Sequence, residues 1–541
     1  MNPIPTLRQS IADLLRNIAA PSKSVDTPVA RWEWLAVAVL VFLSLSLGLP
    51  NLAGPSLWHD ELVHVYVARN IADTGWPALP SGNFYPSSTA YNSLLAAFIK
   101  VLGDDAFSVR LPSVLLGGMN TALVYFLCRG WLGRSTALWA AFFFATSPWQ
   151  VGWARQARLY EFQITSYLLM LGLAWRYFYS TDSKALFPLG SGAILAYVTG
   201  LLTSFHSILY LGAPGAFAIL AVLRNRILKS RWSAAIVACS ILGILTIASF
   251  YLNPNPVDRA AVFETGIGGR LLDQLRTDRY YYFRFLGGNL SLGFFLLALF
   301  GSAVLLYRRD PKTFWVLLAF WVPVLILTYL VGYRRHRFMF FAYPVYIMIY
   351  AHGLVVLLAL LREYRRSRLH GVVAILLVLF LIRLGYSQVQ LLGDSLEAAA
   401  GAHTTLATSH PQWKEPAEWV KANRTNEAIL TTTFLPVFYY LGHVDDWFPN
   451  RYTKWEYQES GMEGLGSLEE LKGFLAEHPQ GYFLAEYSRF AQWRHYGSLV
   501  QDLGREVDWV EAHMEYIEEA SSEDVHVWRW DFEENGEVIV P

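Results

Sequence analysis

Long apolar runs constrain the fold of this chain more than any other feature of its sequence. About eleven runs are long enough to cross a hydrocarbon core of about 30 Å, which takes about 20 helical residues. Their approximate limits are 33–50, 110–128, 134–151, 160–179, 186–203, 206–223, 232–252, 286–307, 313–332, 338–361 and 370–391. Only 16% of the 541 residues are charged, against about 25% in soluble domains. The sequence therefore predicts a polytopic α-helical membrane protein and excludes a disordered, collagen-like or coiled-coil chain.

Charge divides the chain into two unlike parts. Residues 392–541 hold 27 acidic and 10 basic residues, whereas residues 1–391 hold 16 acidic and 33 basic residues. We therefore expect a cytoplasmic arm at 1–32, a transmembrane domain at 33–391 with a long outer loop at 51–109, and an acidic α/β domain at 392–541. The basic excess does not indicate nucleic acid binding, because membrane proteins place Lys and Arg in cytoplasmic loops.

The basic loops also predict an orientation. Short loops rich in Lys and Arg stay in the cytoplasm, and an N-terminus inside puts most of these clusters there. They lie at 129–134, 176–184, 224–231, 308–312 and 362–368. With an odd number of spans, the acidic tail then lies outside, so we expect a multi-pass protein of the cell membrane.

Several arginines do not follow this orientation and stand in loops assigned to the outside. They are Arg155, Arg158, Arg334, Arg335 and Arg337, with several more between 259 and 284. Lipid head groups or local acidic partners are one explanation. An anionic substrate is the other, because a guanidinium group binds phosphate oxygens through two hydrogen bonds.

The loop after the first span carries an acidic pair, Asp60 and Glu61. It contains two amphipathic stretches, up to residue 72 and over 90–102, which we expect to be helices lying on the membrane interface. Consecutive helical side chains point about 100° apart, so one carboxylate can face a cavity while the other pairs with an Arg or caps the helix. At this position a carboxylate can act as a general base; helix capping is the structural alternative.

Other polar residues near the outer ends of the spans are further candidates. Arg158 and Glu161 are three residues apart, which would put them on one face of the fourth helix; a membrane-edge Arg with a neutralising Glu is the alternative. His206 falls in a short outer turn and could contact a polar substrate or simply face water. His59 and His64 flank the acidic pair, but their spacing does not match the HExxH zinc motif.

The tail has the composition of a soluble domain. After a predicted linker at 401–416, helical patterns at 416–421, 437–442 and 467–471 alternate with strand patterns at 428–432, 481–485 and 525–530. This order predicts a small α/β domain. It has no nucleotide-binding or hydrolase motif, so we expect it to bind the acceptor or to cover the active-site mouth.

The order of these motifs resembles a known superfamily. The acidic pair at 60–61 is followed by Tyr85-Pro86, by 110–113 (RLPS), by 154–160 (ARQARLY) and by Arg337 ahead of 343–344 (YP). This set, over about residues 30–390, is similar to the lipid-carrier-dependent GT-C glycosyltransferases, which include protein O-mannosyltransferases and the aminoarabinose transferases of lipid A. The resemblance implies a polyprenyl-phosphate-linked sugar as donor, Asp60 as catalytic base supported by Glu61, and Arg158 and Arg337 as donor-phosphate ligands.

Two departures from the family pattern bear on these roles. The aminoarabinose branch has a Lys near the position of Tyr85, which this chain lacks, and no outer loop is long enough for the β-trefoil insert of the protein O-mannosyltransferases. The complete candidate set is as follows. Catalytic residues are Asp60, Glu61 and Glu161; phosphate ligands are Arg155, Arg158, Arg334 and Arg337; substrate contacts are His59, Tyr85 and His206.

The chemistry requires few groups. A sugar phosphate already has a good leaving group, which needs charge stabilisation more than protonation, and Arg can supply this without a metal. One carboxylate suffices to take the proton of the acceptor hydroxyl in a direct displacement with inversion. We therefore expect no cofactor and no metal, with the lipid-linked donor, membrane lipids and a protein, lipid or glycan acceptor as partners.

Three other functions remain open. A transporter or flippase for a lipid-linked sugar would also need many helices and outer arginines, although no inverted repeat is visible. An oligosaccharide-transferring GT-C enzyme would hold a metal at the acidic pair. A structural subunit would tolerate substitution of Asp60.

Overall fold

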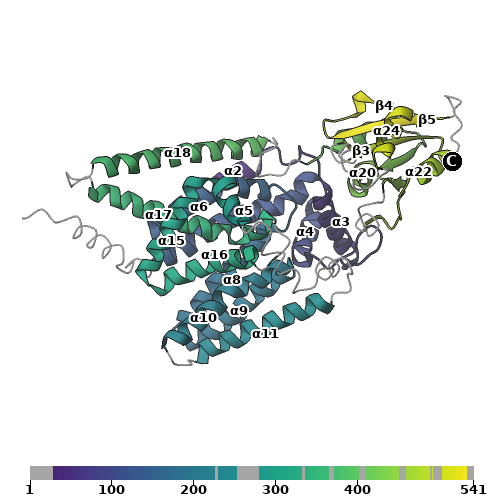
Figure 1. Cartoon of the computed structure of the whole chain (residues 1–541). Coiled ribbons are helices and arrows are strands. Elements are labelled where there is room, and N and C mark those ends of the chain that lie inside the picture. Colours follow the sequence, from purple (N-terminus) through teal and green to yellow (C-terminus); the bar gives the residue numbers. More distant parts are fainter. Residues whose placement is uncertain are drawn as a thin grey trace, which may run out of the picture. The chain divides into compact units, whose positions relative to one another are not determined.

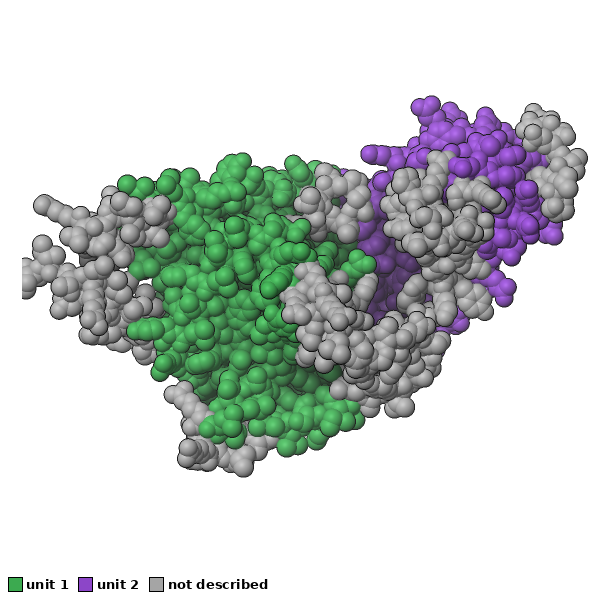
Figure 2. All heavy atoms as spheres, viewed as in Figure 1, with its two compact units in different colours: residues 1–50, 113–407 green, residues 51–112, 408–541 purple. Residues whose placement is uncertain are grey.

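The computed structural model describes residues 28–225, 230–252, 280–329, 331, 335–364, 371–400, 410–449, 459–487, 490 and 503–532. The chain forms two compact units, each made of two segments of the sequence (Figure 2). Unit 1 comprises residues 1–50 and 113–407, and unit 2 comprises residues 51–112 and 408–541. The loop that carries Asp60 thus groups with the C-terminal segment.

The described part of unit 1 is helical (Figure 1). Its elements are α2 (Arg31–Gly48), α5 from residue 113 on (the whole helix is Ala106–Leu132), α6 (Arg134–Ala145), α7 (Pro148–Ala154), α8 (Tyr160–Tyr179), α9 (Ser183–Leu201), η1 (Phe205–Leu211), α10 (Gly212–Asn225), α11 (Ser230–Leu252), α14 (Tyr281–Arg284), η2 (Phe285–Leu290), α15 (Leu292–Arg308), α16 (Pro311–Tyr329), η3 (His336–Ala342), α17 (Tyr343–Tyr364) and α18 (Gly371–Ala400).

Membrane-spanning helices are present, as the apolar runs predict. Within the described residues, six helical segments are long and apolar enough to cross a bilayer. They are Arg31–Gly48, Ala106–Leu132, Ser183–Leu201, Phe205–Leu223, Pro311–Tyr329 and His336–Leu361. The coarse prediction of a polytopic helical protein is therefore confirmed, whereas the number of about eleven spans stays a prediction.

One expected span is not a single helix. The run 134–151 is divided into α6 and α7 at Thr146 and Ser147. Ser147 caps α7 by accepting a hydrogen bond from the backbone N–H of Gln150, and Pro148 occupies the first turn. Both residue types favour a helix start at this position, because Ser satisfies an end N–H and Pro has none to lose. The prediction of one span over 134–151 is wrong for this reason.

Close helix contacts hold unit 1 together. Helices α15 and α17 approach so closely that a Cβ atom at Gly301 would overlap the backbone carbonyl oxygen of Ile349, and one at Gly353 would overlap that of Leu297. Small residues at a helix crossing allow this approach and are typical of membrane helix packing. The two glycines therefore set the distance between these helices.

Unit 2 combines the outer loop with the tail. The two amphipathic stretches of the loop form α3 (His59–Thr74) and α4 (Thr89–Leu102), as predicted. The elements of the tail are α19 (Lys414–Asn423), β1 (Ala428–Thr431), α20 (Phe434–Leu441), β2 (Asp446–Trp447), α22 (Leu468–Glu477), β3 (Gln480–Glu486), α24 (Leu503–His513), β4 (Glu515–Tyr516), η4 (Glu518–Ala520) and β5 (Val525–Asp531).

The strands make one mixed sheet in the order β2-β1-β3-β5-β4. Strand β1 is parallel to both β2 and β3, whereas β5 is antiparallel to β3 and β4. All three predicted strands are present, and Ser467 caps α22 as its sequence indicates. The described part of the predicted linker 401–416 is not a linker: the side chain of Trp413 is buried, and α19 begins at Lys414.

Candidate active site

The acidic pair lies in the first turn of α3, where its two members have different surroundings. Glu61 is fully buried, whereas Asp60 is partly exposed. Glu61 accepts hydrogen bonds from Nε and Nη2 of Arg110, at 2.8 and 2.7 Å, and a longer one from the backbone N–H of Trp58. As expected, one carboxylate of the pair is engaged by an Arg and by the helix start.

Arg110 also fixes the loop that precedes α3. Its Nη atoms donate to the carbonyl oxygens of Leu52, Pro55 and Ser56 at 2.8 to 2.9 Å. The side chain is almost completely buried, so its charge depends on Glu61 and these carbonyl groups for compensation. The motif 110–113 was noted in the sequence, but the partner of Arg110 was not, since 49 residues separate it from Glu61.

The C-terminal segment supports the same loop from within unit 2. Nε2 of His59 lies 3.1 Å from Oε1 of the buried Glu459. The ring of Trp58 stacks on His410 with 3.8 Å between centroids, and the backbone N–H of Leu57 donates to the hydroxyl of Tyr440. Burial raises the pKa of Tyr440 well above its usual range, so the hydroxyl stays protonated. Asp60 is therefore flanked by residues that are held in place.

Histidine and tyrosine candidates of unit 2 have structural contacts. Nδ1 of His64 lies 2.9 Å from Oδ1 of Asn92, which joins α3 to α4. The backbone N–H of Tyr85 donates to the carbonyl oxygen of Pro77. Among the described residues, no group of three or more His, Cys, Asp or Glu side chains is placed to hold a metal ion.

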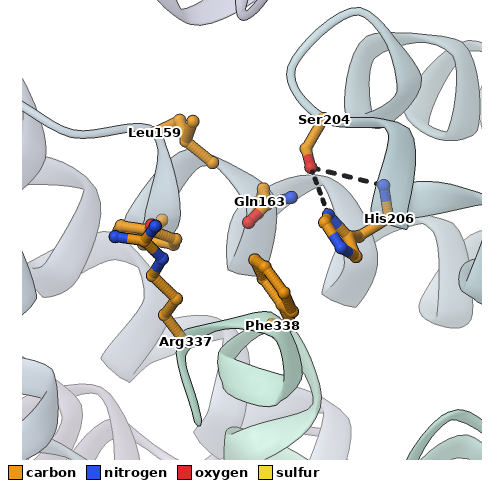
Figure 3. Close-up of a pocket in the computed structure, with 7 residues that line it drawn as sticks. Leu159, Gln163, Ser204, His206, Arg337 and Phe338 are labelled. Atoms are coloured by element: carbon orange, nitrogen blue, oxygen red, sulfur yellow. Dashed lines mark hydrogen bonds between the residues drawn. The ribbon is translucent and has the colours of Figure 1, made fainter. Parts of the chain in front are cut away.

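Unit 1 contains a small cavity of about 140 Å³ with both polar and apolar lining residues. Two candidates from distant turns, His206 and Arg337, both line it (Figure 3). The other lining residues are Leu159, Tyr160, Gln163, Ser204 and Phe338. Sequence reasoning did not single out Gln163, which is one turn into α8 and carries no distinctive pattern.

Local contacts orient the side chains around this cavity. Ser204 caps η1 by accepting a hydrogen bond from the backbone N–H of His206, and its Oγ lies 3.3 Å from Nδ1 of that residue. The imidazole ring stacks on Phe338 with 4.0 Å between centroids. On the other side of the cavity, Nη2 of Arg158 donates to the hydroxyl of Tyr160 at 3.2 Å, so Arg158 contacts a residue of the cavity wall.

The remaining arginine candidates have different positions. Nη1 of Arg155 donates to the carbonyl oxygens of Gly48 and Pro50, at 2.9 and 2.5 Å. It thus caps the end of α2, where helix carbonyls have no partner within the helix. Arg334 lies outside the described residues. A phosphate role for either residue stays a prediction.

Arg158 and Glu161 do not share a helical face, because α8 begins only at Tyr160 and Arg158 lies in the preceding bend. Glu161 is fully buried and does not line the cavity. Its Oε2 accepts from Nδ2 of Asn120 at 2.8 Å, and its Oε1 has no hydrogen-bond partner in the described part of the chain. The described geometry thus gives Glu161 a place inside the helix packing.

Known proteins share both a sequence signature and the fold. The family model of dolichyl-phosphate-mannose-protein mannosyltransferases matches residues 89–250. ArnT from Cupriavidus metallidurans bound to undecaprenyl phosphate superposes with a TM-score of 0.60 at 13% identity, covering 92% of this chain and 98% of that chain. The chain is similar to these glycosyltransferases in part of its sequence and in its fold. No curated protein sequence matches it.

Two oligosaccharyltransferase structures share the GT-C fold as well. AglB from Archaeoglobus fulgidus in complex with an inhibitory peptide and a dolichol-phosphate gives a TM-score of 0.58 at 12% identity, covering 90% of this chain and 72% of that chain. The Archaeoglobus fulgidus enzyme in complex with Zn and sulfate gives 0.57 at 13% identity, covering 92% and 73%. The predicted resemblance to lipid-carrier-dependent GT-C enzymes is therefore confirmed.

Proposed function

We propose that this chain is a GT-C glycosyltransferase that moves a sugar from a polyprenyl-phosphate donor to an acceptor hydroxyl at the outer membrane face, with inversion and without a metal ion. The observation that carries the proposal is the cavity of unit 1. It brings together Arg337 and His206, two residues chosen from separate outer turns, next to Tyr160, which contacts Arg158. A basic cavity is suited to the phosphate of a lipid-linked sugar. The ArnT structure with bound undecaprenyl phosphate supports the donor class.

The division of roles within the acidic pair supports Asp60 as the base. Glu61 is committed to Arg110 through two hydrogen bonds, and its burial separates it from an acceptor. Asp60 is partly exposed on the first turn of the same helix. A general base must reach the proton that it removes, which favours Asp60 over its neighbour.

The reaction then needs a single displacement. The acceptor oxygen attacks the anomeric carbon, its proton passes to the carboxylate of Asp60, and the bond from that carbon to the phosphate oxygen breaks. The leaving polyprenyl phosphate keeps the electron pair of this bond. Arg337, with Arg158 beside Tyr160, stabilises its negative charge, as fixed cationic donors do for developing oxyanions. The acceptor attacks from the face opposite the phosphate, which inverts the configuration.

Two variants test these roles in reconstituted membranes supplied with polyprenyl-phosphate sugars. Asp60→Asn should bind donor normally and lose transfer by about 10²–10⁴-fold, the usual contribution of general-base catalysis. Arg337→Ala should weaken donor binding more than it slows the bound complex. Wild-type transfer by the first variant would remove Asp60 from the mechanism, and unchanged donor affinity in the second would remove the phosphate role.

A metal-dependent oligosaccharide transfer is the second candidate function. It is favoured by one observation, the shared fold with an oligosaccharyltransferase solved with Zn and sulfate. Addition and removal of divalent metal during the same transfer assay separates the two candidates. The transporter alternative predicts movement of a labelled lipid-linked sugar across the bilayer without formation of a glycosidic product.

The same proposal assigns the topology. The basic loops favour a cytoplasmic N-terminus and an extracytoplasmic unit 2. A cysteine-labelling reagent that does not cross membranes, used on intact cells, should modify a single cysteine introduced at exposed Glu523 of the tail but not one at exposed Lys184. The reverse pattern would contradict the proposed orientation.

A further inference from the structure

The cavity of unit 1 has two chemically different ends. Arg337 lies at one side, and Ser204 and His206 lie at the other, with Gln163 and Phe338 between them (Figure 3). The first end supplies a cation, the second supplies a hydroxyl and an imidazole, and the amide of Gln163 lies between them. This arrangement is more than a phosphate requires, because a phosphate could be held by guanidinium groups alone.

Gln163 presents a side-chain amide to the cavity. Its side chain is 4% exposed and faces the cavity. Within the described part of the chain its side-chain amide makes no hydrogen bond. Its backbone N–H donates to the carbonyl oxygen of Leu159, and its backbone carbonyl oxygen accepts from Ser166 and Tyr210. The amide therefore faces the cavity with its donor and its acceptor available to a ligand. An amide can donate to one hydroxyl group and accept from another.

His206 is fixed so that only one of its ring nitrogens can serve a ligand. Nδ1 is 3.3 Å from Oγ of Ser204, and the stack on Phe338 holds the plane of the ring. Nε2 makes no hydrogen bond with any described residue, so it is the nitrogen left to contact a ligand. The cavity thus has two polar side chains in fixed positions: Gln163 on α8 and His206 on η1.

The charge of the wall limits what these groups can recognise. No described residue that lines the cavity is acidic, and Arg337 adds a positive charge. Glu161, the nearest acidic candidate along α8, is bonded to Asn120 inside the helix packing and does not line the cavity. An ammonium group placed here would face a cation with no carboxylate to compensate it. Hydroxyl groups fit the wall, whereas a cationic amino group does not.

We propose that Gln163 and His206 form a sugar-recognition subsite that reads the hydroxyl groups of the donor, and that the donor carries an uncharged sugar rather than a cationic amino sugar. The inference rests on the proposed function, because it takes the donor phosphate to lie at the Arg337 end. The cavity has a volume of about 140 Å³. The lipid chain lies outside it.

Binding of three short-chain prenyl phosphates to the full-length protein in nanodiscs tests the inference. The probes carry a neutral hexose, the corresponding amino sugar, or no sugar. Gln163→Leu should weaken binding of the neutral sugar phosphate about tenfold, as expected when a ligand hydroxyl loses its hydrogen-bond partner. Its affinity for the sugar-free prenyl phosphate should not change. Gln388→Leu makes the same chemical change on α18, outside the cavity, and should alter neither affinity.

Two further results separate this inference from the proposed function. Gln163→Glu should reverse the preference and bind the amino sugar phosphate more tightly than the neutral one. Arg337→Ala should weaken binding of all three probes. Equal weakening of all probes by Gln163→Leu, or preference of the wild-type protein for the amino sugar, would overturn the subsite while leaving the donor class intact. Unchanged binding of every probe by Arg337→Ala would overturn the proposed function itself.

Discussion

The acidic pair gives the most decisive prediction: replacing each carboxylate by an amide should affect stability at Glu61 and transfer activity at Asp60. Glu61→Gln and Asp60→Asn each replace a carboxylate by an amide of the same size. Glu61 is 0% exposed and Arg110 3% exposed, so their ion pair is shielded from solvent. Removal of one partner of such a pair costs about 3–5 kcal/mol, because the other charge is left buried. The glutamine retains one acceptor oxygen, so we expect the lower end, about 3 kcal/mol.

This cost corresponds to a measurable shift in thermal unfolding. Unit 2 has about 200 residues, and in domains of that size each 1 kcal/mol shifts Tm by roughly 2–4 °C. Glu61→Gln should therefore lower the Tm of unit 2 by roughly 6–12 °C. Intrinsic tryptophan fluorescence in nanodiscs can follow this transition, since Trp58 lies directly before α3.

Asp60→Asn is the matched comparison. It should unfold at the wild-type temperature, because Asp60 is partly exposed and does not support Arg110. It should lose transfer activity, because the proposed base is removed. If Glu61→Gln unfolds at the wild-type temperature and is inactive, then Glu61 takes part in the chemistry instead of supporting the loop. If Asp60→Asn destabilises unit 2 as strongly as Glu61→Gln, the separation of roles within the pair is refuted.

Three further outcomes are expected. Glu459→Ala removes the partner of His59, so it should lower kcat with little change in donor affinity. It should also cost about 1–3 kcal/mol of stability. A rise in donor KM alone would contradict a positioning role for Glu459. Treatment with EDTA should leave transfer unchanged, and a loss that added metal restores would favour the metal-dependent alternative. Gly301→Ala should lower the Tm in detergent, because the overlap of the new Cβ costs about 1–3 kcal/mol or more. The control Gly385→Ala should leave the Tm unchanged, since its Cβ has open space. Equal Tm values for the two variants would contradict the close approach of α15 and α17.

The sequence predicts the local features of this protein well. Apolar runs indicate membrane helices because length and hydropathy are properties of single segments. The alternation at 525–530 likewise predicts β5, and the Ser-x-x-Glu pattern at 467–470 predicts the start of α22. The break at Ser147 and Pro148 was readable in principle, since both residues favour a helix start. Hydropathy alone does not reveal this break, because the residues around it are apolar.

Contacts between distant segments could not be predicted. His59 and Glu459 are 400 positions apart, and nothing in the pattern around either residue specifies the other. Arg155 and Arg158 look equivalent in the sequence, but one caps α2 and the other contacts Tyr160. Their difference depends on where α7 ends and α8 begins. The position of Gln163 in the cavity wall could not be predicted either, because it follows only from the packing of α8 against η1 and η3.

The two-segment make-up of unit 2 has a consequence for biosynthesis. Residues 51–112 leave the ribosome long before residues 408–541, yet the loop that bears Asp60 is braced by Gln412, Tyr440 and Glu459. A nascent or truncated chain therefore has Asp60, the proposed base, but not the contacts that fix its loop. We expect transfer activity to arise only after residues 408–541 have been synthesised and folded.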